Sequence, residues 1–175
     1  MPVSVSGAIV AGGAALNFAW SPDGTYLVFN GDKDTAGVVE LYVVPAAGGA
    51  PLQVSGALVA NGDIQGTFAW SGDGRRVGFY GDKDTDAILE AYSVPVTGGV
   101  PTKLNGPLVG ALGVRYPGPV AAPDGQRVAF IAEMEVTDKL DLYVVGFAGG
   151  EARKVNGVMA SDRDVSTFAW SPLSN

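Results

Sequence analysis

The sequence contains no cysteine and no histidine. Without cysteine, the chain has no disulfide, no thiolate nucleophile and no thiolate zinc site. Without histidine, it has no imidazole metal ligand and no Ser-His-acid triad. We therefore expect a protein that is not an enzyme in its own right. The lack of thiols fits any cellular compartment.

The chain also lacks a long apolar run and an excess of positive charge. No apolar stretch reaches the roughly 18 residues that a membrane span needs. The formal net charge of −7 disfavours nucleic acids and anionic membranes as partners. The first residues, Met1-Pro2-Val3-Ser4-Val5, carry no basic region and do not read as a secretory signal. We expect no nucleic-acid partner and no membrane insertion.

Glycine is abundant, with 26 of 175 residues, and one motif returns at a fixed interval. The stretch Phe18-Ala19-Trp20-Ser21-Pro22-Asp23-Gly24 returns as Phe68-Ala69-Trp70-Ser71-Gly72-Asp73-Gly74. A degraded copy stands at Val120-Ala121-Ala122-Pro123-Asp124-Gly125, and another begins at Phe168-Ala169-Trp170-Ser171-Pro172. With Ala121 counted as a Trp position, the intervals are 50, 51 and 49 residues. A period of this length predicts a repeat architecture.

Each period contains four short apolar segments separated by turn residues, at 18–20, 26–29, 39–44 and 51–54 in the first copy. Alternation of Tyr, Val and Leu with polar residues predicts strands. Pro-Asp-Gly predicts a tight turn, because proline fixes φ, aspartate bonds the backbone and glycine accepts a positive φ. The glycine pair after the third segment predicts a hairpin. Four strands without a helical pattern predict an antiparallel blade.

Radial repetition of such blades gives an all-β fold, a β-propeller built from four-stranded antiparallel blades of about 50 residues. We expect one repeat domain over 1–175, with a blade junction and end strand at 1–15, blades at 16–55, 66–105 and 116–156, and the inner strand of a fourth, incomplete repeat at 166–175. Pro117 and Pro119 precede the third inner strand, which tolerates them if it is a sheet edge.

The repeat resembles the TolB-type propeller repeat, in which an apolar inner strand runs into Trp-Ser-Pro-Asp-Gly. Trp20 to Gly24 match this motif, followed by Phe29 and Tyr42. The second copy departs from it at Gly72, and the third lacks the tryptophan. The resemblance covers almost the whole chain. It implies a bacterial, extracytoplasmic setting and a protein partner that docks on a propeller face.

The repeated aromatic and turn residues are expected to be structural. A tryptophan that recurs once per blade beside a turn is typical of packing between blades, although it could also stack on a ligand. The structural set comprises Trp20, Trp70, Trp170, Asp23, Gly24, Asp73, Gly74, Asp124 and Gly125.

Acidic links are the main candidates for binding. Antiparallel strand order places the links after each second strand and the blade junctions on one face, which gathers Asp32, Asp34, Asp82, Asp84, Asp86, Glu133, Glu135, Asp138, Asp63, Asp162 and Asp164. The alternating Asp82, Asp84 and Asp86, with Asp32 and Asp34 in the first copy, resemble the start of a calcium loop. Against this, Lys33 and Lys83 lie among them, and a solvated hairpin is the alternative. The acidic face could also receive a protein partner.

The sequence is compatible with three functional interpretations. The first is a non-catalytic scaffold or interaction module. The second is the regulatory propeller of a larger hydrolase such as a serine peptidase. The third is an excised or engineered fragment without a native task.

A self-association is expected from the number of blades. Propellers close with about four to eight blades. Three blades leave two apolar faces bare, and such faces drive association. A homodimer joined head to tail would supply six blades, and the strand at 167–172 could replace or extend a partner's first blade by strand exchange.

Overall fold

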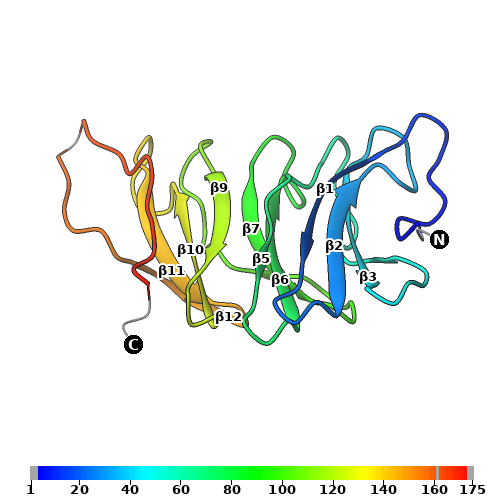
Figure 1. Ribbon diagram of the computed structural model, residues 1–175. Coiled ribbons are helices and arrows are strands. Elements are labelled where there is room, and N and C mark those ends of the chain that lie inside the picture. Colours follow the sequence, from blue (N-terminus) through cyan, green and yellow to red (C-terminus); the bar gives the residue numbers. More distant parts are fainter. Residues whose placement is uncertain (1–3, 161, 173–175) are drawn as a thin grey trace.

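The computed structural model describes residues 4–160 and 162–172, and these residues form an all-β protein (Figure 1). They make three four-stranded antiparallel sheets, each from consecutive strands. The predicted fold class is therefore confirmed. Residues 1–3 of the expected end segment and 173–175 of the expected fourth repeat lie outside the described residues.

We call the three sheets blades 1 to 3. Blade 1 contains β1 (Ala15–Trp20), β2 (Tyr26–Gly31), β3 (Glu40–Pro45) and β4 (Leu52–Gln53). Blade 2 contains β5 (Ala69–Trp70), β6 (Arg76–Gly81), β7 (Glu90–Pro95) and β8 (Thr102–Lys103). Blade 3 contains β9 (Val114–Ala121), β10 (Arg127–Ala132), β11 (Asp141–Gly146) and β12 (Gly149–Lys154). The blades stand side by side in sequence order (Figure 1).

The second and third strands form the regular centre of every blade. β2 pairs with β3 over six positions, and the corresponding pairs in blades 2 and 3 keep the same register. This register places Phe29 opposite Tyr42, and the two rings stack with centroids 5.2 Å apart. The equivalent rings in blades 2 and 3 stack at 5.4 and 6.1 Å. Cross-strand aromatic pairs stabilise a sheet beyond their buried area.

Most of the core lies between the blades, because each sheet is apolar on both faces. A third cluster, Leu27, Phe29, Tyr42 and Val44, lies on the face of blade 1 that points away from blade 2, and Val5 packs against it. Val28, Leu41 and Val43 of blade 1 pack against Trp70 and Phe79 of blade 2. A second cluster joins blade 2 to blade 3 through Ala91, Leu104, Val128, Phe130 and Tyr143. Neighbouring blades therefore bury each other's apolar faces, as expected of a repeat protein, whereas the outer face of blade 1 is buried without a neighbouring blade among the described residues.

The first and fourth strands of the sheets vary more than the sequence suggested. β5 has two residues, whereas β9 has eight. β4 and β8 have two residues each, whereas β12 has six. These strands form the two edges of each sheet, where only one side needs a bonded neighbour. β9 contains Pro117 and Pro119 and pairs only with β10, so the prolines do lie on an edge strand.

The part of the chain that the structure describes contains no helix long and apolar enough to cross a membrane.

Candidate functional site

The Pro-Asp-Gly turn is held by its own aspartate. Asp23 Oδ1 accepts hydrogen bonds from the Ser21 hydroxyl at 2.6 Å and the Thr25 amide at 3.0 Å. Ser21 Oγ in turn accepts from the Tyr26 amide at 2.9 Å. These donors, the Ser21 hydroxyl foremost, lower the pKa of Asp23 to about 2. Gly24 follows with a φ of +70°, the left-handed conformation that glycine adopts without strain.

The turn recurs in blades 2 and 3 with one change of partner. Asp73 accepts from the Ser71 hydroxyl at 2.7 Å and the Arg75 amide at 3.0 Å, and both lower its pKa. In blade 3, Ala122 replaces the serine, and Arg127 Nε instead donates to Asp124 at 2.9 Å. The expected structural residues Gly74 and Gly125 also have positive φ values, +66° and +64°.

Gly72 breaks the repeat pattern for a reason that the structure supplies. Its amide donates to the Gly125 carbonyl at 2.7 Å, which joins the turns of blades 2 and 3. A Cβ on Gly125 would lie 2.2 Å from the Gly72 Cα. Proline, which stands at this position in the first copy, has no amide hydrogen and could not make the bond.

The acidic loops, residues 32–39, 82–89 and 133–140, connect the second and third strands of the blades. Asp82 accepts the Asp63 amide at 2.7 Å on one oxygen and the Ala87 amide at 3.2 Å on the other. Asp32 does the same with the amides of Ala14 and Gly37, and both bonds lower its pKa. The first acid of each loop therefore fastens its blade to the incoming junction.

Glu133 takes this place in blade 3, where it accepts from the amides of Leu112 and Asp138. It is fully buried. The sequence analysis placed Glu133 on the acidic face without a role. The sequence signal that could have predicted this role is an acidic residue directly after the second strand of every blade.

Acidic residues in the blade junctions accept amides from the preceding blade. Asp63 Oδ1 accepts the Val39 amide of blade 1 at 2.7 Å, while its own amide bonds to Asp82 of blade 2. Asp164 Oδ1 accepts the Leu140 amide of blade 3 at 2.8 Å in the same way. Five acids of the acidic face thus cap backbone amides at the blade junctions: Asp32, Asp63, Asp82, Glu133 and Asp164.

The proposed calcium ligands are not brought together. Asp34 pairs with Lys33 at 2.5 Å, and Asp84 pairs with Lys83 and Lys103 at 2.9 and 3.1 Å. Asp86 is exposed. Among the described residues, no group of three or more acidic side chains is arranged to hold a metal ion. The carboxylate oxygens of Asp32 and Asp82 accept hydrogen bonds from backbone amides, so calcium binding would have to break those bonds.

A buried tyrosine–carboxylate pair, which the sequence analysis missed, lies beside these loops. The Tyr42 hydroxyl donates to Glu40 at 2.6 Å, and the Tyr92 hydroxyl donates to Glu90 at 2.7 Å. Burial is the largest cause of the raised pKa of both tyrosines, and the hydrogen bond to the glutamate is the second largest. Blade 3 has Asp141 in place of the glutamate, and the buried Tyr143 hydroxyl finds no partner among the described residues. The sequence signal that could have identified these pairs is an acidic residue two positions before the tyrosine in each repeat.

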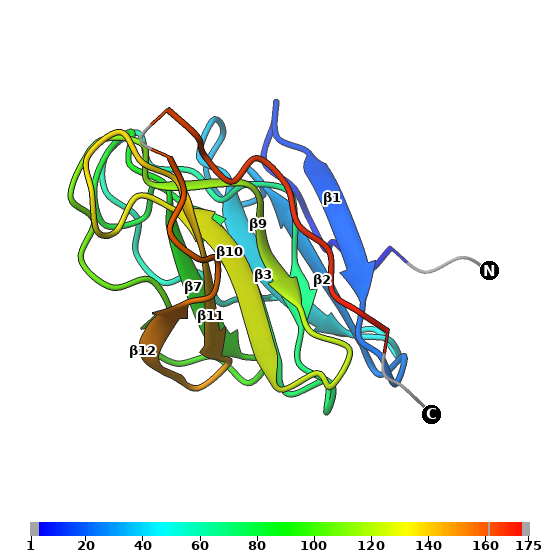
Figure 2. The same ribbon diagram turned by 90° about the vertical axis from the view of Figure 1, so that its left-hand side faces the viewer.

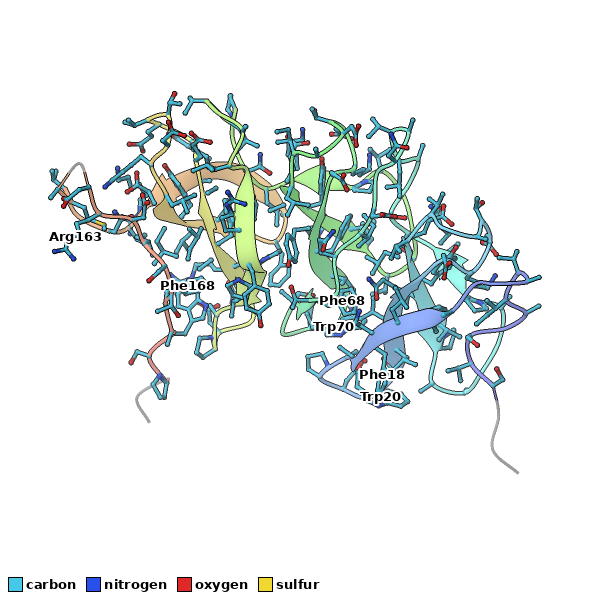
Figure 3. The ribbon with its side chains drawn as sticks, turned by 90° about the horizontal axis from the view of Figure 1, so that it is seen from above. Phe18, Trp20, Phe68, Trp70, Arg163 and Phe168 are labelled. Atoms are coloured by element: carbon cyan, nitrogen blue, oxygen red, sulfur yellow. The ribbon has the colours of Figure 1, made fainter. Side chains whose placement is uncertain are left out.

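The tryptophans occupy three different environments despite their identical Phe-Ala-Trp context. Trp70 is 8% exposed between blades 1 and 2, as expected for inter-blade packing. Trp170 is half-buried against blade 3, and its indole N–H donates to the Val120 carbonyl at 3.1 Å. Trp20 is 54% exposed and fills no inter-blade wedge in this structure. Figure 3 shows Phe68 and Trp70 between the first two blades and Phe18 and Trp20 at the rim of blade 1.

The exposure of Trp20 follows from the direction in which β1 presents its side chains. Ala19 packs against the core shared with blade 2, so its neighbours Phe18 and Trp20 face away from blade 2. No described blade lies on that side. Leu16, Phe18 and Trp20, 53%, 69% and 54% exposed, form what we call the β1 stripe.

Comparison with known proteins supports the architecture. No protein-family model and no curated protein matches the chain. Among solved structures, it resembles a putative TolB from Agrobacterium tumefaciens, with a TM-score of 0.59 and 23% identity over 81% of this chain and 46% of that one. TolB from Acinetobacter baumannii gives a TM-score of 0.53 and 15% identity, over 81% and 32% of the chains.

Peptidases are also similar. A puromycin-hydrolyzing peptidase of Mycobacterium tuberculosis matches with a TM-score of 0.59 and 18% identity, over 88% of this chain and 22% of that one. The chain therefore spans less than half the length of each of these structures. At these identities the likeness shows the fold alone: this chain has a β-propeller architecture similar to that of TolB and of prolyl peptidases.

Proposed function

We propose that the chain is a non-catalytic propeller module of the TolB type that works by docking to other proteins, and that its first partner is a second copy of itself. The observation that carries this proposal is the β1 stripe. Phe68 and Trp70 pack into the core between blades 1 and 2, whereas Phe18 and Trp20 of the same Phe-Ala-Trp sequence stand exposed on blade 1. Exposed apolar patches of this kind mark interaction sites.

A head-to-tail contact suits this stripe best. Blade 2 receives blade 1 through Trp70, so blade 1 would receive blade 3 of another copy through Trp20. Such a contact is heterologous and ends only when a ring closes. Two copies supply six blades, within the range of about four to eight at which propellers close.

The lack of catalytic activity is supported by the chemistry of the side chains. The Ser21 and Ser71 hydroxyls both donate to the aspartates of their own turns. The sequence contains no histidine to activate them. Hydrogen bonds to backbone amides account for the repeated turn aspartates and for the first acid of each acidic loop.

A second candidate rests on the likeness to peptidases, of which this chain covers about a fifth. As a regulatory propeller of a hydrolase, the blades would dock on a catalytic domain rather than on a second copy. A neighbouring segment with a Gly-x-Ser-x-Gly motif would favour this candidate.

Light scattering after size exclusion tests the proposal on the 175-residue chain. A dimer, with twice the monomer mass of 17.8 kDa, is expected at micromolar concentration. A monodisperse monomer under the same conditions would contradict self-docking.

A further inference from the structure

The segment that follows blade 3 takes the path of a blade-to-blade junction. The Val165 amide donates to the Leu140 carbonyl at 3.0 Å. The same bond joins Ile64 to Val39 at 2.9 Å and Val114 to Leu89 at 2.7 Å in the two internal junctions. Val165 is therefore bonded to blade 3 as Ile64 is to blade 1 and Val114 is to blade 2.

Residues 166–172 then lie over the free face of blade 3. Phe168, Ala169 and Trp170 border a pocket of about 280 Å³ whose other walls are Arg127, Ala129, Leu142, Val144, Arg153 and Val155. The Trp170 indole donates to Val120 of β9, and the Arg127 guanidinium lies 5.7 Å from the centre of its ring. Figure 2, which looks onto this side, shows the segment running past β9. We call this surface of blade 3 the slot.

The slot corresponds to the surface of blade 1 that Trp70 covers. Leu142 and Val144 of the slot stand two repeats on from Leu41 and Val43. Trp70 arrives there on β5, which is paired with β6 and continues into a whole blade. Residues 166–172 form no strand and are only partly buried. The segment thus places a Phe-Ala-Trp tripeptide on blade 3 where β5 places one on blade 1, but without strand pairing.

In a head-to-tail contact, β1 of a second copy would occupy the same slot. It carries the identical Phe-Ala-Trp sequence, from Phe18 to Trp20. Two identical tripeptides cannot occupy one slot, so either residues 166–172 or β1 must leave.

The bonds that each segment would lose decide which one leaves. β1 is paired with β2 at five positions, the Asn17 amide bonds to the Asn30 side chain, and Ala14 is held by Asp32. Residues 166–172 are held to blade 3 by the Trp170 indole bond, the Arg127 contact and the apolar pocket wall. Releasing residues 166–172 therefore breaks fewer bonds.

We propose that residues 166–172 form a displaceable cap on the slot, which shields blade 3 and opposes docking of the β1 stripe of a second copy. This inference rests on the proposed head-to-tail docking. The cap lowers the apparent affinity between copies because it competes from within the chain at a high effective concentration. The alternative, in which residues 166–172 exchange into the partner's blade 1 as a clasp, has the opposite consequence for the same variants.

The test measures the dimer dissociation constant of the full chain by sedimentation equilibrium. Trp170→Ala removes the indole hydrogen bond to Val120 and the contact with Arg127, and we expect it to lower the dimer dissociation constant about tenfold. Phe168→Ala acts on the same cap and guards against misfolding of one variant. Val158→Ala, at a fully exposed position, is the matched control and leaves the constant unchanged. Weaker dimerisation of Trp170→Ala would establish the clasp, and an unchanged constant would also overturn the cap.

A peptide separates the cap from dimerisation itself. A fluorescent peptide with the sequence of residues 15–24 is titrated into the wild type and Trp170→Ala, and the cap predicts tighter binding to the variant. If the peptide shows this preference while all variants stay monomeric, the cap stands and self-docking falls. Equal binding to both proteins, or binding to neither, would reject the cap.

Discussion

At the scale of single residues, the same side chain has different energetic weight according to what lies beside it. Trp20 and Trp70 occupy the same place in the repeat and the same tripeptide. One is buried by the blade before it, whereas the other faces away from all described blades. Their substitutions therefore form a matched pair.

Trp70→Ala is expected to lower the free energy of unfolding by about 3–5 kcal/mol, because it leaves a cavity between blades 1 and 2. Trp20→Ala is expected to cost the monomer less than about 1 kcal/mol, because the ring is already half in water. Urea denaturation at a concentration low enough to prevent association measures both. Equal losses would show that the two environments do not differ as described.

Residue identity also shows what the sequence could and could not predict. The turn role of Asp23 and Gly24 was readable, because the turn closes within five residues. The exposure of Trp20 was not, because it depends on the presence of a neighbouring blade rather than on the tripeptide. Gly72 could have been read as a contact site, since it alone replaces the proline of the complete turn copies.

At the scale of elements, the blades are joined by carboxylates that accept backbone amides. Asp63 and Asp82 connect blade 1, the junction and blade 2 in one chain of bonds. The sequence predicted that these acids share a face. It could not predict their partners, because Asp82 and Asp63 meet across 19 positions through a junction of irregular structure. The calcium hypothesis stays a prediction that would require this network to open.

Asp82→Ala is expected to destabilise the chain by about 1–3 kcal/mol, because two amides lose their acceptor at a buried site. Asp86→Ala, in the same loop but exposed, is expected to change stability by less than about 0.5 kcal/mol. Thermal melts of both variants, each in calcium and in EDTA, provide the measurement. A calcium-dependent rise in melting temperature that Asp86→Ala abolishes would favour a metal loop over the capping network.

At the scale of the whole molecule, repetition gives the chain a pH window of stability. The turn aspartates have lowered pKa values, that of Asp23 reaching about 2, so the stability they supply is present above about pH 4 and is lost as the pH falls. Burial raises the pKa of Tyr92, and that of Tyr143 to about 12. Their neutral forms are favoured in the fold, so this stability is lost as the pH rises above about 10.

We therefore expect the free energy of unfolding to be level near neutral pH and to fall on both sides. Urea denaturation at pH 3, 7 and 11 measures it, and tyrosinate absorbance follows the alkaline limb. Tyr92→Phe, which cannot ionise, should soften the alkaline fall. A stability that stays constant to pH 11 would contradict the assignment of the buried tyrosines.

Contacts that repeat between neighbouring blades indicate where two copies would meet in a head-to-tail dimer. Gly98 of blade 2 lies against Leu52 of blade 1, and Gly149 of blade 3 lies against Thr102 of blade 2. By the same repeat, the loop around Gly48 of one copy would lie against Arg153 of another. Ala47 and Arg153 are both exposed, and the chain has no cysteine of its own.

Cross-linking between Ala47→Cys and Arg153→Cys is therefore the most direct measurement. The two single variants are mixed, treated with a short bis-maleimide and analysed on a denaturing gel. The account predicts a cross-linked dimer in the mixture and none in either variant alone. Cross-linking of one variant with itself would indicate a symmetric contact between like faces, and no cross-linking in the mixture would contradict head-to-tail docking.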